Sequence, residues 1–222
     1  MTMIPDPQPL GIEQSIAFWE DRHRGLANRF AGGDLSYDDM GNVAFNALRI
    51  GRLLDILGTL AEPAAPLRLL DAGCGTGWVT RALASFGHQV DGIDSAPAAV
   101  AACRDQARAD CRDHYALSRL DTWAPAYLYD AVVSVDVMFH IMEDSVWAAS
   151  LVNLASLVRS EGHMVLADHD LAEDHVWGHY QMSRARRRYV DVLAAEGFVH
   201  RRFVPYEFRY NKAGFHVFDR IT

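Results

Sequence analysis

The sequence has few cysteines, no long apolar run and no excess of positive charge, and each absence excludes a class of protein. Its three cysteines form neither an even framework of bridges nor a C-x-x-C pair, so a disulfide scaffold and a zinc site of that type are not predicted. No apolar run approaches the roughly 18 residues of a membrane span. The first residues also lack the basic and apolar regions of a signal peptide. We therefore expect a cytoplasmic protein that binds no metal.

The charge balance lacks what a nucleic-acid surface needs. There are 29 acidic and 21 basic residues, which gives a formal net charge of −8, whereas phosphate binding requires a basic stripe. Half of the 222 residues are hydrophobic and 23% are charged, a composition typical of a globular protein with a sizeable core. We expect a single domain over residues 1–222 that contacts neither nucleic acid nor membrane. It is predicted to be a monomer or a homodimer.

The most informative stretch covers residues 71–78, D-A-G-C-G-T-G-W. An apolar run over 67–70 precedes it and a helical pattern over 79–86 follows it, which predicts a strand, a tight glycine turn and a helix. Glycines at alternate positions remove each Cβ where the backbone would meet a ligand. The helix behind the turn offers free N–H groups and the positive end of its dipole. The pattern favours a nucleotide or nucleoside beyond the carboxyl end of the strand.

This turn lacks the third glycine of a dinucleotide fingerprint. The spacing G-x-G-x-x-G needs a glycine at Trp78 when it is counted from Gly73, and at Thr80 when it is counted from Gly75. A nicotinamide-dependent oxidoreductase is therefore disfavoured. An acid, Asp71, stands two residues before the first glycine. It would repel a phosphate, but it suits a cationic amino acid group held through water or backbone groups.

Strand and helix patterns alternate along the rest of the chain, which predicts a parallel sheet with helices on both faces. Two amphipathic helices precede the glycine turn, and the last two predicted strands are separated by the hairpin signal N-K-A-G at 211–214. The predicted helices cover 12–30, 37–60, 96–109, 145–158 and 174–196. The later predicted strands cover 88–93, 115–117, 131–135, 164–167, 200–210 and 215–221.

The D-x-G-x-G-x-G pattern resembles motif I of the class I S-adenosylmethionine (SAM) methyltransferases, in their small-molecule branch. The resemblance covers roughly residues 40–170. It implies a Rossmann-like α/β core over 66–222, with seven mostly parallel strands and an antiparallel C-terminal hairpin, and an N-terminal helical lid over 1–60. It also implies SAM as the methyl donor. The donor-binding residues that it assigns to the turn are Asp71, Gly73, Gly75, Gly77 and Trp78.

Two acids after later strands continue the resemblance. Asp94 and the adjacent Ser95 end the second strand, 23 residues beyond Asp71, where an acid binds the hydroxyls of a ribose. The alternative for Asp94 is a helix N-cap. Asp121 follows the third strand, where the family keeps an acid for the adenine amino group, with Thr122 and Trp123 flanking the ring. The alternative there is a turn aspartate with a core tryptophan.

An arginine often binds the donor's carboxylate in this family, about one helix ahead of motif I. Arg49 and Arg52 stand at that distance, and we favour Arg52. The helices around it also carry three polar residues that we expect to face the site, Tyr37, Asn42 and Asn46, and we assign the first two to the acceptor.

Two histidines at strand tips are the candidate catalytic residues. His140 lies a few residues beyond the fourth strand and His169 just beyond the fifth. A histidine titrates near pH 7, as a base for a hydroxyl or ammonium acceptor must. The alternative for His140 is a structural histidine bonded to the backbone. The N/D-P-P-Y/F signature of many nucleic-acid and protein methylases is absent after the fourth strand, which favours a small acceptor.

Basic residues gather late in this acidic chain. On a helix over 174–196, Tyr180, Arg184 and Arg187 would share a face, and we expect them to bind an anionic group of the acceptor. The alternative is a solvated helix face. The sequence thus predicts SAM-dependent methylation of an O or N atom of a small metabolite, with an anionic acceptor in specialised metabolism as the sharper hypothesis. A macromolecular methyltransferase, an oxidoreductase and a non-catalytic SAM-binding module remain the alternatives.

Overall fold

The fold is built around one large sheet, which the computed structural model describes together with its helices over residues 8–25, 36–60, 65–107, 113–209 and 211–221. The strands of the sheet are β1 (Arg68–Ala72), β2 (Gln89–Asp94), β3 (Asp113–Leu117), β4 (Tyr129–Val135), β5 (Val158–His169), β8 (Phe198–Pro205) and β9 (Ala213–Arg220). Their order is β3-β2-β1-β4-β5-β9-β8. The strand β9 runs antiparallel to both β5 and β8, and the other neighbours are parallel. The predicted Rossmann-like sheet with an antiparallel C-terminal hairpin is confirmed.

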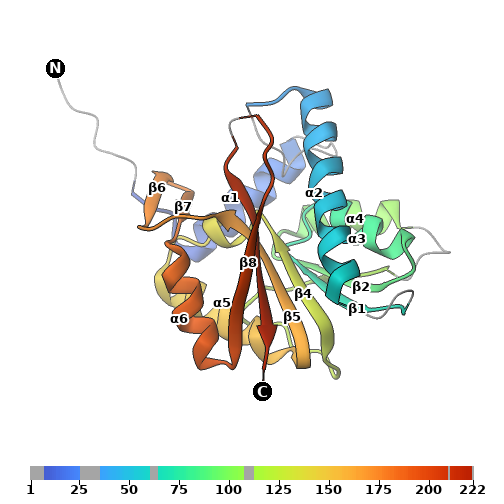
Figure 1. Cartoon of the computed structure of the whole chain (residues 1–222). Coiled ribbons are helices and arrows are strands. Elements are labelled where there is room, and N and C mark those ends of the chain that lie inside the picture. Colours follow the sequence, from blue (N-terminus) through green and yellow to red (C-terminus); the bar gives the residue numbers. More distant parts are fainter. Residues whose placement is uncertain (1–7, 26–35, 61–64, 108–112, 210, 222) are drawn as a thin grey trace.

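Helices cover both faces of the sheet (Figure 1). They are α1 (Ile12–Gly25), α2 (Asp39–Leu60), α3 (Trp78–Ser85), α4 (Pro97–Gln106), α5 (Asp144–Ser156) and α6 (Arg186–Ala195). The pair α5 and α6 packs on one face, and α2 and α3 pack on the other. Among the described helices, none combines the length and the apolar character needed to cross a membrane.

Neighbouring residues of the central strands point to opposite faces of the sheet, as the pleat requires. On β4, Val132 packs in the cluster with α5 and α6, whereas Val133 packs in the cluster with α2 and α3. On β5, Leu166 and Val165 divide in the same way. Strands that are apolar on both faces are typical of a parallel sheet between two helix layers. This packing fixes the carboxyl ends of β1, β2 and β4 side by side.

The predicted helix over 174–196 is wrong in its first half. A small antiparallel hairpin, β6 (His175–Gly178) and β7 (Gln181–Ser183), takes its place, and α6 begins only at Arg186. Val176 and Trp177 are residue types that favour strands. The correction matters because residues that would share one helix face no longer do so.

The other predicted elements are confirmed except at their ends. The strand expected from 164 begins at Val158, and the strand expected over 200–210 ends at Pro205. The end of the helix predicted over 12–30, the end of the helix predicted over 96–109, and Tyr210 lie outside the described residues.

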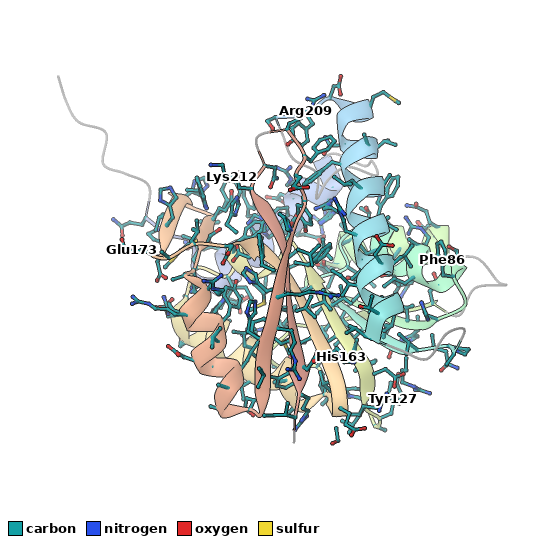
Figure 2. All side chains as sticks on the ribbon, viewed as in Figure 1. Phe86, Tyr127, His163, Glu173, Arg209 and Lys212 are labelled. Atoms are coloured by element: carbon teal, nitrogen blue, oxygen red, sulfur yellow. The ribbon has the colours of Figure 1, made fainter. Side chains whose placement is uncertain are left out.

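The turn between β8 and β9 carries Arg209 and Lys212, which Figure 2 shows at the end of the hairpin, beside the start of α2. The guanidinium of Arg209 lies 5.2 Å from the ring centre of Tyr37. Tyr37 in turn packs edge-on against Phe45 and Phe208. The end of the C-terminal hairpin is thus joined to α2 by an aromatic cluster.

Candidate active site

A pocket of about 170 Å³ opens beyond the carboxyl ends of β1, β2 and β4. Side chains of α1, α2 and a short 3-10 helix, η1 (Met138–His140), line its walls. Of the predicted site residues, the pocket brings together Asp71, Gly73, Gly75, Trp78, Asp94, Ser95, Asp121 and His140. It is not lined by the other predicted residues, which are Gly77, Thr122, Trp123, Arg52, His169, Tyr37, Asn42, Tyr180, Arg184 and Arg187.

The glycine turn has backbone conformations that favour glycine. Gly73 has a φ of 85°, and a Cβ there would overlap the side chain of Val137. Gly75 has a φ of 52°, and a Cβ there would meet only Cε1 of His23, at 3.8 Å. Gly77 is the N-cap of α3. At Gly75 the turn therefore presents open backbone to the pocket, just ahead of a helix N-terminus, as the sequence predicts.

Asp71 is buried at the base of the turn. The hydroxyl of Thr80 donates to its Oδ2 at 2.6 Å. Burial raises the pKa of Asp71 to about 6, and the hydrogen bonds from Thr80 oppose this shift. The side chain thus joins the glycine turn to α3 and carries its charge only above that pH.

The raised pKa of Asp71 makes a prediction for stability. An unfolded aspartic acid titrates near 3.9, so Asp71 favours folding fully below about pH 4, and this contribution is lost as the pH rises through about 6. We compare the unfolding free energies of Asp71→Asn and the wild type at pH 4 and at pH 7.5. The difference between the two proteins should shift by about 2–3 kcal/mol in favour of the variant at the higher pH. Urea unfolding of both proteins at the two pH values measures this. A difference that is independent of pH would contradict it.

Asp94 ties the glycine turn to the start of α4. Its Oδ2 accepts a hydrogen bond from the N–H of Gly75 and its Oδ1 accepts one from the N–H of Ala96, both at 2.9 Å. Burial raises the pKa of Asp94, and these two N–H groups oppose the shift. Ser95 lines the pocket beside it. The N-cap of α4 is Ala96 and has no side-chain cap, so Asp94 is not the N-cap that the alternative required, and its carboxylate lines the pocket.

Asp121 lines the pocket next to a residue that sequence reasoning missed. Arg119 donates to both of its carboxylate oxygens, at 2.9 and 2.6 Å, and also lines the pocket. The expected ring stacking of Trp123 is corrected, because its Nε1 donates to the hydroxyl of Tyr129 at 3.0 Å and its ring packs against the core. Thr122 is exposed. The position of Trp123 therefore matches the alternative interpretation, in which it is a core residue.

The arginine that lines the pocket is Arg49, not Arg52. The guanidinium of Arg49 is buried and bonds to the carboxylate of Asp136 and to the side chain of Asn46. Arg52 lies on a more exposed side of α2, and its Nη2 is 3.8 Å from a carboxylate oxygen of Glu207. The two positions differ by less than one helical turn, so their spacing in the sequence does not separate them.

Asp136 is the second residue that sequence reasoning missed. It lies just beyond β4, lines the pocket and has a φ of 57°, a conformation that is uncommon for a residue with a side chain. Burial raises the pKa of Asp136, and the charge of Arg49 opposes this shift. Backbone strain at a pocket is often a sign of function. The sequence does carry a signal for Asp136, because it is an acidic residue directly after an apolar strand.

His140 lies in the pocket wall, and its ring is oriented by the backbone. Its Nδ1 is 3.0 Å from the carbonyl oxygen of Tyr180. A carbonyl only accepts hydrogen bonds, so Nδ1 carries the proton and Nε2 keeps a lone pair. The ring lies 4.6 Å from that of Trp19 on α1. Burial lowers the pKa of His140 to about 4, so the ring is neutral at pH 7.

His169 stands outside the pocket lining. Its Nδ1 is 3.1 Å from Oγ of Ser183 and 3.5 Å from Oδ1 of Asp168. These contacts join β5 to the β6–β7 hairpin. The structure therefore separates the two predicted catalytic histidines.

The predicted acceptor-binding residues do not converge. Arg184 is fully buried, and it donates to Oδ1 of Asp144 at 2.9 Å and to the carbonyl of Met142 at 3.0 Å. Arg187 is exposed on α6. Tyr180 stacks on Phe18. The correction follows from the hairpin, which replaces the helix that would have aligned these side chains.

The two residues expected from the N-terminal helices have partners within the protein. Tyr37 belongs to the aromatic cluster below the C-terminal hairpin. Asn42 donates from its side chain to the carbonyl oxygens of Tyr37 and Asp38, at 3.1 and 3.3 Å. Asn46, one turn later on α2, lines the pocket where Asn42 does not.

Comparison with known proteins identifies the family. A family model for a methyltransferase domain matches residues 45–201, more than half of the chain. The chain belongs to the methyltransferase domain family. The predicted family is confirmed.

Individual relatives of this methyltransferase are distant. Nodulation protein S of Sinorhizobium fredii is 23% identical over 146 residues, which cover 66% of this chain and 68% of that protein. The ubiquinone biosynthesis O-methyltransferase of Maricaulis maris is 33% identical over 134 residues, 55% of this chain and 50% of that protein. The match thus spans about half the length of that relative.

A solved structure with bound SAM shares the fold. The magnesium protoporphyrin IX methyltransferase from Synechocystis PCC 6803 superposes with a TM-score of 0.68 at 18% identity, and the match covers 90% of each chain. The predicted Rossmann-like methyltransferase fold is confirmed.

Proposed function

We propose that this methyltransferase moves the methyl group of SAM to an oxygen or nitrogen atom of a small metabolite. The observation that carries the proposal is one pocket that joins the glycine turn to two polar side chains beyond β4, Asp136 and His140. The first half suits the donor, and the second half offers hydrogen bonds to an acceptor. SAM supplies an activated methyl group with a neutral leaving group, so the protein mainly has to orient the acceptor and exclude water.

On the donor side we propose Asp94 for the ribose, Asp121 for the adenine amino group and Arg49 for the carboxylate. The residues fit these groups in chemistry, since carboxylates accept from hydroxyl and amino groups and a guanidinium donates to a carboxylate. The buried Nε of each of Arg49 and Arg52 has no hydrogen-bond partner in the described part of the chain, and Arg49 is chosen because it lines the pocket and Arg52 does not. This assignment replaces the one made for Arg52 from the sequence.

On the acceptor side, the pocket offers groups that accept hydrogen bonds. The Nε2 atom of His140 keeps its lone pair because Nδ1 is bonded to the carbonyl of Tyr180. Asp136 contributes carboxylate oxygens. Both therefore suit an acceptor that carries an N–H or O–H group, which they can orient with its lone pair toward the methyl group.

An anionic acceptor, the sharper hypothesis from the sequence, has less support from this pocket. Arg184 and Arg187 do not line it. Of the two arginines that do, Arg119 is paired with Asp121, and Arg49, which is paired with Asp136, is already proposed for the carboxylate of the donor. We therefore propose a neutral or basic acceptor, and its place in specialised metabolism stays a prediction.

The orientation of His140 predicts its behaviour on titration. Burial lowers the pKa of His140 to about 4, so we expect no titration of this ring between pH 5.5 and pH 8. An ordinary histidine, with a pKa near 6.5, would titrate in this range. Nitrogen NMR of histidine-labelled protein measures this, and His140→Phe identifies the signal. The expected signal is that of a neutral ring protonated at Nδ1. A midpoint near 6.5 would contradict the burial and would restore His140 as a general base.

Donor and acceptor binding can be tested in one series. Calorimetric titration with SAM, S-adenosylhomocysteine and NADH is expected to show binding of the first two only. SAM with a deuterated methyl group is then offered with benzylamine, benzyl alcohol and phenylacetate, and mass spectrometry records which probe gains the label. We expect label on the amine or the alcohol. Binding of NADH alone would refute the function, and label on phenylacetate alone would refute the proposed acceptor chemistry.

The remaining alternatives from the sequence differ in what they require of the protein. A macromolecular methyltransferase needs a surface for its large substrate, and the net charge of −8 disfavours RNA. A non-catalytic SAM-binding module needs no polar groups beyond β4, yet Asp136 and His140 stand there. Methyl transfer to a small acceptor is the function that uses both halves of the pocket.

A further inference from the structure

One histidine of α1 lines the pocket and leaves a ring nitrogen unpaired. His23, in the last turns of the helix, is only 9% exposed. Its Nδ1 is buried and makes no hydrogen bond within the described part of the chain. Buried polar atoms without a partner are rare in native proteins, and each one calls for an explanation. Since His23 lines the pocket, a ligand bound there can supply the missing partner.

The ring of His23 lies over the donor side of the pocket. Its Cε1 would be 3.8 Å from a Cβ on Gly75. The carboxylate of Asp94, which accepts from the N–H of Gly75, acts electrostatically on the ring. Gly75, Asp94 and His23 therefore surround the same part of the pocket, which is the part proposed above for the ribose.

The position of His23 follows from how α1 is held. Glu20, three residues earlier, accepts a hydrogen bond from the N–H of Ala98 at 2.7 Å, at the start of α4. At the other end of α1, the N–H of Ile12 donates to Oε1 of Glu143 at 2.6 Å. The helix is thus fixed across the pocket at both ends, and His23 is held near Asp94.

We propose that His23 binds a ribose hydroxyl group of SAM, so that α1 forms part of the donor site. The inference rests on the proposed function, because it requires the ribose at Asp94. A hydroxyl both donates and accepts hydrogen bonds and therefore matches either tautomer of a neutral imidazole, whereas Asp94 only accepts. Burial lowers the pKa of His23, which keeps the ring neutral at pH 7. Donor binding then also fastens α1 over the pocket.

The test replaces His23 with leucine, which fills similar space without a polar atom. We expect S-adenosylhomocysteine to bind about tenfold more weakly by calorimetry. The melting temperature of the ligand-free variant is expected to equal or exceed that of the wild type, because an unpaired buried nitrogen has been removed. A purely structural histidine would give the reverse, a lower melting temperature and unchanged affinity, and that result would overturn the inference.

Two further variants make the result unambiguous. Asp21→Ala changes an exposed residue of the same helix and should leave the affinity within about twofold of the wild type. His23→Asn places an amide near the position of Nδ1, and we expect it to bind more tightly than His23→Leu. If the asparagine variant binds as weakly as the leucine variant, or if the leucine variant matches Asp21→Ala, the hydrogen bond is refuted. Failure of the wild type to bind the ligand would refute the proposed function instead.

Discussion

Replacing Arg49 with methionine is expected to destabilise the protein by about 3 kcal/mol, the lower end for buried pairs, because it leaves the half-buried carboxylate of Asp136 without its charged partner. Methionine keeps part of the packing over Phe45, whose ring centre lies 4.4 Å from the guanidinium. We also expect a large loss of affinity for S-adenosylhomocysteine, since the proposed partner of its carboxylate is removed. Urea unfolding and calorimetry measure the two effects.

The same change at Arg52 is the matched control. Arg52 lies on the same helix and forms a longer, largely exposed ion pair of 3.8 Å with Glu207, and such pairs contribute about 0–1 kcal/mol. We therefore expect Arg52→Met to resemble the wild type in both measurements. If Arg52→Met loses donor affinity while Arg49→Met keeps it, the assignment made from the sequence is right and the one made from the structure is wrong.

A double variant separates stability from binding at this site. Adding Asp136→Asn to Arg49→Met removes the unpaired charge, so it should recover much of the lost stability. It should not recover donor affinity, because the guanidinium is still missing. Recovery of both would mean that Arg49 acts on the donor only by keeping the pocket folded.

The part of the pocket at the glycine turn could be predicted because its signals are local. The glycine turn combines spacing, backbone conformation and a following helix within eight residues, and Asp94 follows at a fixed strand end. The same holds for the sheet, whose strands alternate with helices along the chain. Patterns of this kind depend on neighbours in sequence, which is why sequence reasoning finds them.

The opposite wall of the pocket depends on contacts between residues that are far apart in the sequence. Arg49 is selected over Arg52 by Asp136, which lies 87 residues further along the chain. The hairpin at 175–183 is closed by Asp174, whose carboxylate accepts from the N–H of Ala185 and from Arg188. A helical interpretation of 174–196 rested on residue types alone and had no access to these contacts. Sequence reasoning therefore located the pocket but not the side chains on its far wall.

Asp94→Asn is expected to weaken binding of S-adenosylhomocysteine by about 100-fold or more, since hydrogen bonds to a charged group contribute roughly 1.5–3 kcal/mol each and several are affected. The carboxylate holds the N–H groups of Gly75 and Ala96 and is proposed to bind the ribose as well. An asparagine side chain can accept with only one of its two terminal atoms. Calorimetry at pH 7.5 measures the loss.

Asp91→Asn supplies the matched control for Asp94. Asp91 lies on the same strand and accepts from the hydroxyls of Tyr127 and Tyr129 at 2.6 and 2.7 Å, but it does not line the pocket. Its replacement should lower stability and leave donor affinity unchanged, so the two variants separate a carboxylate that supports the sheet from one that binds the ligand.

Burial raises the pKa of Asp94, and donor affinity should therefore fall as the pH is lowered through that pKa. If Asp94→Asn binds as tightly as Asp91→Asn, the carboxylate only holds the N–H groups of Gly75 and Ala96, and the ribose must be held elsewhere.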